Sequence, residues 1–174
     1  MRSERLNYEV LDTGHAAELS EALTDPRVYE FISGQYPKTK KELEERFRSV
    51  VRGPRSRSQE RWLNYCIRRQ CDGIAIGRLE ATLSEGRGEV AYLLGTHFWG
   101  KGYATEALAW LHGQLSNDQS IAETWATTEP GNDRSIRLLQ RSGFIEIFDN
   151  WPSLQSYDPG DRVFRASLPS KLNP

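Results

Sequence analysis

The segment from residue 62 to residue 115 constrains the fold more than any other part of the chain. Three stretches with strand character, Trp62–Arg69, Ile74–Leu83 and Glu89–Leu94, are separated by Cys71-Asp72-Gly73 and by Glu85-Gly86-Arg87-Gly88. Asp-Gly pairs and clustered glycines are typical of hairpin turns. We therefore expect three antiparallel strands in a meander, followed by a glycine-rich turn and a helix.

The chain before this segment is predicted to begin with a strand, Leu6–Leu11, and a short helix, Ala16–Leu23. The helix should stop near Asp25-Pro26, because the residue before a proline resists the helical region.

A second N-terminal helix is indicated by a capping box. Thr39 and Glu42 give the pattern T-x-x-E, which opens a helix that we expect to end at about Val51. The polar and basic stretch 52–61 that follows is predicted to be a solvated loop, with phosphate binding as the alternative.

The C-terminal half alternates helices and strands, which predicts a mixed α/β fold with a strand-helix-strand crossover in the middle. The helix Asp133–Ser142 should end at Gly143, where a left-handed residue is needed. The predicted order is β-α-α-β-β-β-α-β-α-β-β, in a single domain spanning residues 1–174. The other elements of this half are predicted at Gly100–Leu115 (helix), Glu123–Thr128, Phe144–Phe148 and Arg162–Leu168 (strands).

Charge and composition exclude several classes of protein. The chain has 23 Lys and Arg against 24 Asp and Glu, a net charge of −1, which argues against electrostatic binding of nucleic acid. The longest apolar run, Val90–Leu94, is too short to span a membrane, and the polar residues 1–5 open no signal peptide. Cys66 and Cys71 lack the second pair that a zinc site needs, so we expect no metal. These features predict a soluble, cytoplasmic protein.

The turn at Gly100-Lys101-Gly102 is the most informative functional feature. A helix start leaves about four backbone N–H groups unpaired and partly positive, and glycines remove the Cβ atoms that would keep a phosphate away. Ala104 is small for the same reason, and Lys101 adds a full positive charge. The segment therefore predicts a pyrophosphate cradle, with a tight strand-to-helix turn as the purely structural alternative.

Two common phosphate motifs fit this turn poorly. Gly95-x4-Gly100-Lys101 matches a P-loop, but Gly102 stands where a Ser or Thr hydroxyl is required for magnesium. Gly100-x-Gly102-x-x-Thr105 resembles a dinucleotide fingerprint but lacks its third glycine. The preceding strands also look antiparallel, which suits neither fold.

A third motif fits better. Trp99-x-x-Gly102-x-Ala104 resembles the acetyl-coenzyme A signature of the GNAT superfamily of N-acetyltransferases, in which Arg or Gln is followed by x-x-Gly-x-Gly or Ala. The run from Trp99 to Ala107 is especially similar to the branch that contains the ribosomal-protein N-terminal acetyltransferases. Trp99 departs from the Arg or Gln of the signature, but backbone N–H groups should do most of the phosphate binding.

A second match lies about thirty residues further on. Asn132-x-x-Ser135, followed by an amphipathic helix and Gly143-Phe144, resembles the second motif of the same branch in both spacing and order. Asn132 also suits a helix N-cap, and Ser135 a capping partner. The resemblance covers residues 62–148 and is strongest over 90–107 and 129–144.

The resemblance implies a fold, a reaction and a set of cofactor-binding residues. The fold is a GNAT-like central mixed sheet with antiparallel N-terminal strands and helices on both faces. The reaction is transfer of an acetyl group from acetyl-coenzyme A directly to a primary amine, on a protein N-terminus or a small molecule. The residues implied to contact the cofactor are Leu93, Leu94, Trp99, Gly100, Lys101, Gly102, Tyr103, Ala104, Thr105, Asn132 and Ser135.

Direct attack by an amine needs a base, a donor to the oxyanion and an acid for the leaving thiolate. Glu80 and Glu89 are the candidate bases, and His97 is a weaker one. Glu80 shares a strand face with Arg78, so a plain ion pair is its structural alternative. The backbone N–H near Leu94 is the implied oxyanion donor. The candidate acid is Ser135, with Tyr103 in reserve.

The C-terminal segment offers a candidate lining for the acceptor amine. Trp151, Tyr157, Asp158 and Asp161 would give an acidic and aromatic surface suited to a cation. The sequence leaves the acceptor open between protein N-termini, aminoglycosides, polyamines and amino-acid analogues. A non-catalytic acyl-coenzyme A sensor of the same fold and a P-loop nucleotide-binding protein are the alternative functions.

Overall fold

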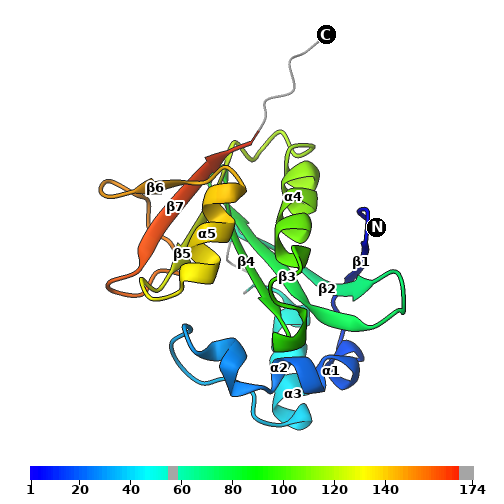
Figure 1. Cartoon of the computed structure of the whole chain (residues 1–174). Helices are drawn as coiled ribbons and strands as arrows, with labels where there is room; N and C mark the ends of the chain where they lie inside the picture. Colours follow the sequence, from blue (N-terminus) through cyan, green and yellow to red (C-terminus); the bar gives the residue numbers. More distant parts are fainter. Residues whose placement is uncertain (55–58, 169–174) are drawn as a thin grey trace.

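A computed structural model describes residues 1–54 and 59–168 and has a seven-stranded sheet in the order β1-β2-β3-β4-β5-β7-β6 (Figure 1). All neighbouring strands are antiparallel except β4 and β5, which are parallel. The mixed α/β class and the central meander of the sequence analysis are confirmed. The strands are β1 Leu6–Val10, β2 Arg61–Arg69, β3 Ala75–Ser84, β4 Arg87–Leu94, β5 Glu123–Thr128, β6 Ile145–Ile147 and β7 Arg162–Ser167.

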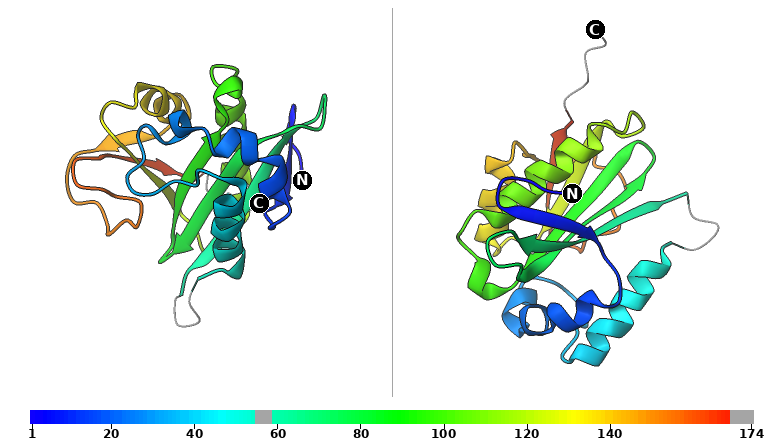
Figure 2. Two further views of the ribbon diagram at one scale, coloured as in Figure 1. Left: turned by 90° about the horizontal axis from the view of Figure 1, so that it is seen from below. Right: turned by 90° about the vertical axis from the view of Figure 1, so that its right-hand side faces the viewer.

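Helices cover both faces of the sheet (Figure 2). One face carries the N-terminal helices, whose apolar side chains form a core with Cys66 and Ala75 of the sheet. The other face carries α4, which packs Ala107, Leu108 and Leu111 into a second core. The helices are α1 His15–Glu18, α2 Ser20–Leu23, α3 Lys40–Arg52, α4 Tyr103–Leu115 and α5 Asp133–Arg141, with 3-10 turns η1 Pro26–Tyr29 and η2 Thr96–Phe98.

Local sequence explains where α3 and α5 begin and end. Thr39 accepts a hydrogen bond from the Glu42 N–H at 3.2 Å, as the capping box predicts, although the Glu42 carboxylate bonds the Lys38 N–H instead. Asn132 caps α5 in the same way, through the Ser135 N–H. Gly143 follows α5 with φ +84°, the left-handed conformation predicted for it.

Most element ends shift by one or two residues from the sequence analysis, and three differences are larger. The predicted helix Ala16–Leu23 is broken at Leu19 into α1 and α2. Helix α4 begins at Tyr103 rather than Gly100, because Gly100 and Gly102 both adopt positive φ angles that a helix interior does not allow. The 3-10 turns η1 and η2 carry no periodic apolar pattern, and the sequence analysis missed both.

The structure bears only in part on two further predictions, the loop at 52–61 and the lack of a membrane-spanning segment. Residues 55–58 of the predicted loop 52–61 lie outside the described residues, and its last residue, Arg61, begins β2. Within residues 1–54 and 59–168, the structure has no helix of the length and apolarity that crossing a bilayer requires.

Gly77 is needed where β3 and β4 approach each other at the end of the meander. A Cβ atom at this position would lie 2.1 Å from the Leu93 carbonyl oxygen, far inside contact distance. The close approach sets the position of Leu93 and Leu94, the last residues of β4.

We predict that Gly77→Ala destabilises the fold while Gly113→Ala stabilises it. Overpacking against the β4 backbone should lower the free energy of unfolding by about 2 kcal/mol. Gly113 lies inside α4 with open space where an alanine methyl group would stand, so alanine there should add about 0.5–1 kcal/mol. Urea unfolding of both variants checks this pair, and equal stabilities would contradict the close approach at Gly77.

Candidate active site

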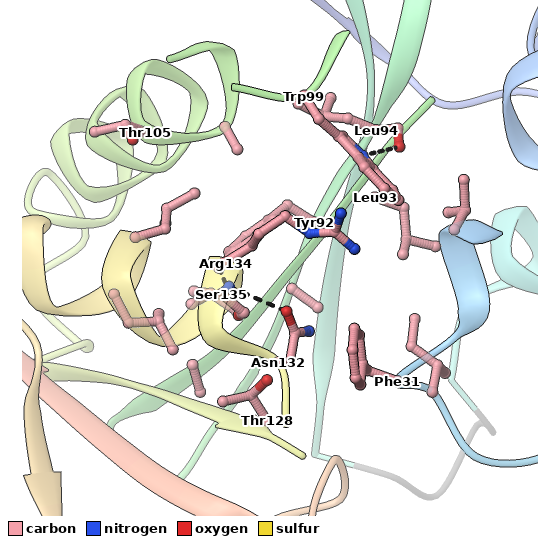
Figure 3. Close-up of a pocket in the computed structure, with 18 of the residues that line it drawn as sticks. Phe31, Tyr92, Leu93, Leu94, Trp99, Thr105, Thr128, Asn132, Arg134 and Ser135 are labelled. Carbon is pink, nitrogen blue, oxygen red and sulfur yellow. Dashed lines mark hydrogen bonds between the residues drawn. The ribbon is translucent and has the colours of Figure 1, made fainter. Parts of the chain in front are cut away.

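The site begins where β4 and β5 stop pairing. In these parallel strands, residues 87–89 of β4 pair with residues 123–125 of β5, and beyond Glu89 and Trp125 the strands diverge. The opening is part of a cavity of about 1160 Å³ that is lined by the end of β4, the end of β5 and the first turns of α4 and α5 (Figure 3).

The end of β4 presents backbone groups to this opening. The Gly95 N–H donates to Ile76 on the β3 side, so strand alternation turns the N–H and C=O of Leu94, Tyr92 and Val90 away from β3. The Trp99 indole Nε1 donates to the Leu94 carbonyl at 2.8 Å, which agrees with that direction. The Leu94 N–H therefore points into the opening.

The turn into α4 supplies a second set of free donors. Among the described residues, no protein group accepts a hydrogen bond from the backbone N–H groups of residues 100–105. Gly102 precedes the helix in the left-handed conformation, with φ +79°. Unpaired N–H groups at the positive end of a helix dipole are suited to binding an anion.

Arg5, the residue before β1, holds this turn in place. Arg5 donates to the Lys101 carbonyl at 3.0 Å and to the Glu106 carboxylate at 2.7 Å. Glu106 also accepts hydrogen bonds from Ser3 and from the Arg5 N–H. Burial raises the pKa of Glu106, but these hydrogen bonds outweigh it, and the pKa is lowered overall. The carboxylate thus stays ionised and ties the chain start to the first turn of α4.

The first turn of α5 brings a hydroxyl to the other wall of the opening. The Ser135 Oγ lies 2.9 Å from the Tyr92 phenol oxygen, and the two share a hydrogen bond. Burial raises the pKa of Tyr92 to about 12, against a smaller lowering by Ser135. The phenol therefore keeps its proton at neutral pH. Asn132 lies beside this pair, with its side-chain oxygen bonded to the Ser135 N–H (Figure 3).

Arg134 crosses the opening between its two walls. Its guanidinium carbon lies 3.8 Å from the centre of the Trp99 ring, and its Nη2 lies 3.7 Å from a carboxylate oxygen of Glu30. Figure 3 shows the arginine side chain directed from α5 toward Trp99 and the end of β4. The contact joins the start of α5 to the turn before α4.

Comparison with known families identifies this arrangement. The family described as "Acetyltransferase (GNAT) domain" matches residues 5–145, most of the chain. The chain belongs to the GNAT acetyltransferase family.

Individual relatives agree with this assignment. The chain is 39% identical over 59 positions to the "Uncharacterized N-acetyltransferase p20" of Bacillus licheniformis, a match that spans 34% of this chain and 33% of that protein. Two solved structures share its fold. They are the ribosomal L7/L12 alpha-N-protein acetyltransferase RimL in complex with coenzyme A (TM-score 0.76, 17% identity, 95% and 96% of the chains) and AAC(6')-Ib in complex with ribostamycin and coenzyme A (0.70, 20%, 93% and 92%).

Most of the predicted cofactor-binding residues line the cavity. Lys101 is the exception, because it is exposed outside the lining and its Nζ lies 6.0 Å from the centre of the Phe98 ring. The residues that do line the cavity are Leu93, Leu94, Trp99, Gly100, Gly102, Tyr103, Ala104, Thr105, Asn132 and Ser135.

The two candidate bases lie in different surroundings. Glu80 lines the cavity and forms the ion pair expected with Arg78, at 3.1 Å. Glu89 is absent from the lining; its carboxylate accepts hydrogen bonds from the N–H groups of Gln155 and Ser156 and from the Ser156 hydroxyl. These bonds give Glu89 a structural role in holding the 154–156 loop.

The remaining predicted side chains divide in the same way. Asp158 and Asp161 line the cavity, whereas His97 does not. Trp151 and Tyr157 pack against each other, with ring centres 5.6 Å apart, in a small core under β5 and β7. The predicted acceptor lining is therefore acidic without being aromatic at these positions.

Sequence reasoning missed Tyr92, Arg134 and Phe31 as lining residues. Arg134 stands inside the Asn132-x-x-Ser135 motif, and that position was the one signal that could have found it. Tyr92 lies on the strand before the glycine turn, where a buried aromatic looks like any core residue. Phe31 follows a 3-10 turn that has no sequence pattern linking it to the site.

Proposed function

We propose that this GNAT protein transfers an acetyl group from acetyl-coenzyme A directly to a primary amine. The observation that carries the proposal is the row of free N–H groups at residues 100–105, placed at the end of the opening between β4 and β5. A groove with free N–H donors at one end suits a long molecule with phosphates at one end and a reactive group at the other.

The residues present fit acetyl-coenzyme A along the whole opening. The N–H groups of residues 100–105 would hold the pyrophosphate, and Arg5 supports them from behind. Beyond the last β4–β5 pair, the Tyr92 N–H and C=O and the Leu94 N–H face away from β3 and can bond the amide-containing arm. When bound, the cofactor supplies an acetyl group activated as a thioester.

Three groups of the chain can then assist an attacking amine. The Leu94 N–H points into the opening and can donate to an oxygen that gains negative charge. Glu80 lines the cavity and can accept the proton that the amine loses. A Tyr92 phenol that donates to Ser135 leaves the serine hydroxyl free to donate its own proton to the leaving sulfur.

The acceptor is proposed only as an amine. RimL is named as a ribosomal-protein N-terminal acetyltransferase, and AAC(6')-Ib was solved with ribostamycin, which carries several amines. Asp158, Asp161 and Glu129 line one part of the cavity, and their negative charges attract an ammonium group.

Calorimetric titration with acetyl-coenzyme A tests the cofactor, and thiol release in the presence of an amine panel tests the reaction. We expect saturable binding together with amine-dependent thiol release. Binding without turnover on peptides, polyamines, aminoglycosides or amino acids would favour the non-catalytic sensor. A folded protein that binds no acetyl-coenzyme A at millimolar concentration would refute the proposal.

For the cradle, we predict that Gly102→Val weakens acetyl-coenzyme A binding far more than Lys101→Ala does. A branched side chain is strained at φ +79°, and its Cβ would lie only 3.3 Å from the Arg5 Nη2, so it would distort the turn that Arg5 holds. The exposed Lys101 charge contributes at most about 1 kcal/mol, roughly a fivefold change in Kd. Calorimetry measures both variants, with thermal melting as the check that each is folded. Equal losses would show that the lysine charge, rather than the backbone, binds the phosphates.

For the acid, we predict that Ser135→Ala and Tyr92→Phe each lower kcat by about 10- to 100-fold with little change in the Kd of acetyl-coenzyme A, because the proton donor acts on the leaving group. The double variant should lose no more than the worse single variant, since the two hydroxyls form one hydrogen-bonded pair. Single-variant effects that multiply in the double variant would argue for independent roles.

For the base, we predict that Glu80→Gln lowers kcat while Glu89→Gln mainly lowers thermal stability. Both changes remove one carboxylate and keep the side-chain size. Only Glu80 lines the cavity, whereas Glu89 holds the 154–156 loop. Thiol-release kinetics and melting curves separate the two effects, and an unchanged kcat in Glu80→Gln would remove Glu80 from the proposed reaction.

A further inference from the structure

The cavity wall formed by β3 contains a buried arginine whose hydrogen bonds are incomplete. The Arg78 side chain is 7% exposed and lines the cavity. Its Nη2 lies 3.1 Å from Glu80, but its Nη1 is buried and has no hydrogen-bond partner among the described residues. Buried donors in native proteins are nearly always paired, so this nitrogen indicates a missing acceptor.

A second arginine stands near the first. Arg46 of α3 also lines the cavity. Its one hydrogen bond within residues 1–54 and 59–168 is a long one, 3.4 Å to the Gln35 carbonyl, and no carboxylate of these residues lies within ion-pair distance of it. Desolvation and the charge of Arg78 both lower the pKa of Arg46, which places the two guanidinium groups within electrostatic range.

The local charge balance at this wall is positive. Arg46 and Arg78 bring two positive charges, and Glu80 brings one negative charge. Tyr29, which lies near all three groups, is neutral, because burial raises the pKa of its phenol and its hydroxyl donates to the Leu23 carbonyl. Arg78 is the buried partner here and Arg46 the exposed one, and a buried guanidinium with a second positive charge in range and only one carboxylate beside it is more stable when an anion binds to it.

We propose that the acceptor is an amine that carries a carboxylate on the adjacent carbon, an α-amino acid, and that Arg46 and Arg78 bind this carboxylate. The inference rests on the proposed acetyltransferase function and names its acceptor class. Guanidinium groups bind carboxylates through short, charge-assisted hydrogen bonds, and the orphan Nη1 of Arg78 supplies one such donor.

The order of charges on β3 matches this acceptor. Arg78 and Glu80 lie two residues apart on the same face of the strand and side by side in the cavity. An α-amino acid presents a carboxylate and an amine separated by one carbon. With the carboxylate on the arginines, the amine lies toward Glu80, the proposed base. A peptide N-terminus or an aminoglycoside has no carboxylate at that distance from its amine.

The experiment compares each of the twenty protein L-amino acids with its own α-carboxamide, at saturating acetyl-coenzyme A, by thiol release. The carboxamide keeps the amine and the side chain and removes only the negative charge. We expect at least one amino acid with a kcat/KM about tenfold or more above that of its carboxamide. Carboxamides or peptide N-termini that react as well as the amino acids, or better, would overturn the proposal.

Three variants assign the preference to the arginines. Arg46→Gln should raise KM for the preferred amino acid about tenfold or more, leave kcat within about twofold and leave the carboxamide kinetics unchanged. Arg48→Gln is the matched control: it removes the same charge from another exposed position of the same helix, one outside the cavity lining, and should change the kinetics of neither substrate. Arg78→Lys keeps the buried positive charge but loses the planar set of guanidinium N–H donors. It should lower the ratio of kcat/KM between the amino acid and its carboxamide in a protein that still melts cooperatively. Equal effects of Arg46→Gln on both substrates would count against the proposal.

Failure of this inference can be told apart from failure of the proposed function. Calorimetric titration of the amino acids into the free protein and into the protein loaded with coenzyme A requires no turnover. Binding that Arg46→Gln weakens supports the carboxylate site even in a protein that turns over no amine. If the protein binds acetyl-coenzyme A but binds no amino acid at concentrations of about 10 mM, the proposed acceptor class is overturned. The proposed acetyltransferase function is then unaffected.

Discussion

The parallel pairing of β4 with β5, which stops at Glu89 and Trp125, is the constraint on which the rest of the structure depends. Backbone N–H and C=O groups that lose their strand partner must find another acceptor or donor, or remain in water. The divergence exposes such groups along the end of β4 in the middle of the sheet, with helices covering both faces. A sheet interrupted at its centre thus gives a groove whose walls are already polar and already rigid.

The two helices that follow the diverging strands complete this groove through their first turns. Helix α4 starts after two glycines with positive φ angles, so its unpaired N–H groups collect at one end. Helix α5 starts at the Asn132 cap, and the same geometry that bonds Asn132 to the Ser135 N–H turns the Ser135 hydroxyl toward Tyr92. Asn132 is therefore the N-cap that the structural explanation in the sequence analysis expected, and its contact with a cofactor stays a prediction.

Local patterns predicted the parts of the site that local geometry determines. The Gly100–Gly102 turn, the Asn132 cap and the Arg78–Glu80 pair each follow from residues close in sequence, through backbone conformation, capping and strand alternation. The contacts of Arg46 with the cavity and of Arg5 with Glu106 join segments far apart in the chain. Exposed arginines of this kind have no periodic signal, because only tertiary packing decides which of them reaches the groove. Glu80 and Glu89 were likewise both candidate bases, with Glu80 slightly favoured for its place within a strand, and only the packing of the 154–156 loop against Glu89 separates their surroundings.

Strand alternation also distributes the proposed proton donor and acceptor. Glu80 is opposite Ala91 in the β3–β4 register, so Tyr92, the next residue, lies on the other face of the sheet. The Tyr92–Ser135 pair therefore approaches the opening from the α4–α5 face, and Glu80 with Arg78 approaches it from the face covered by the N-terminal helices. A reacting group held in the gap between the strands is reached from both faces, so the acid and the base need not compete for the same space. In a sheet without the divergence at Glu89, the strand pairing itself would separate these groups.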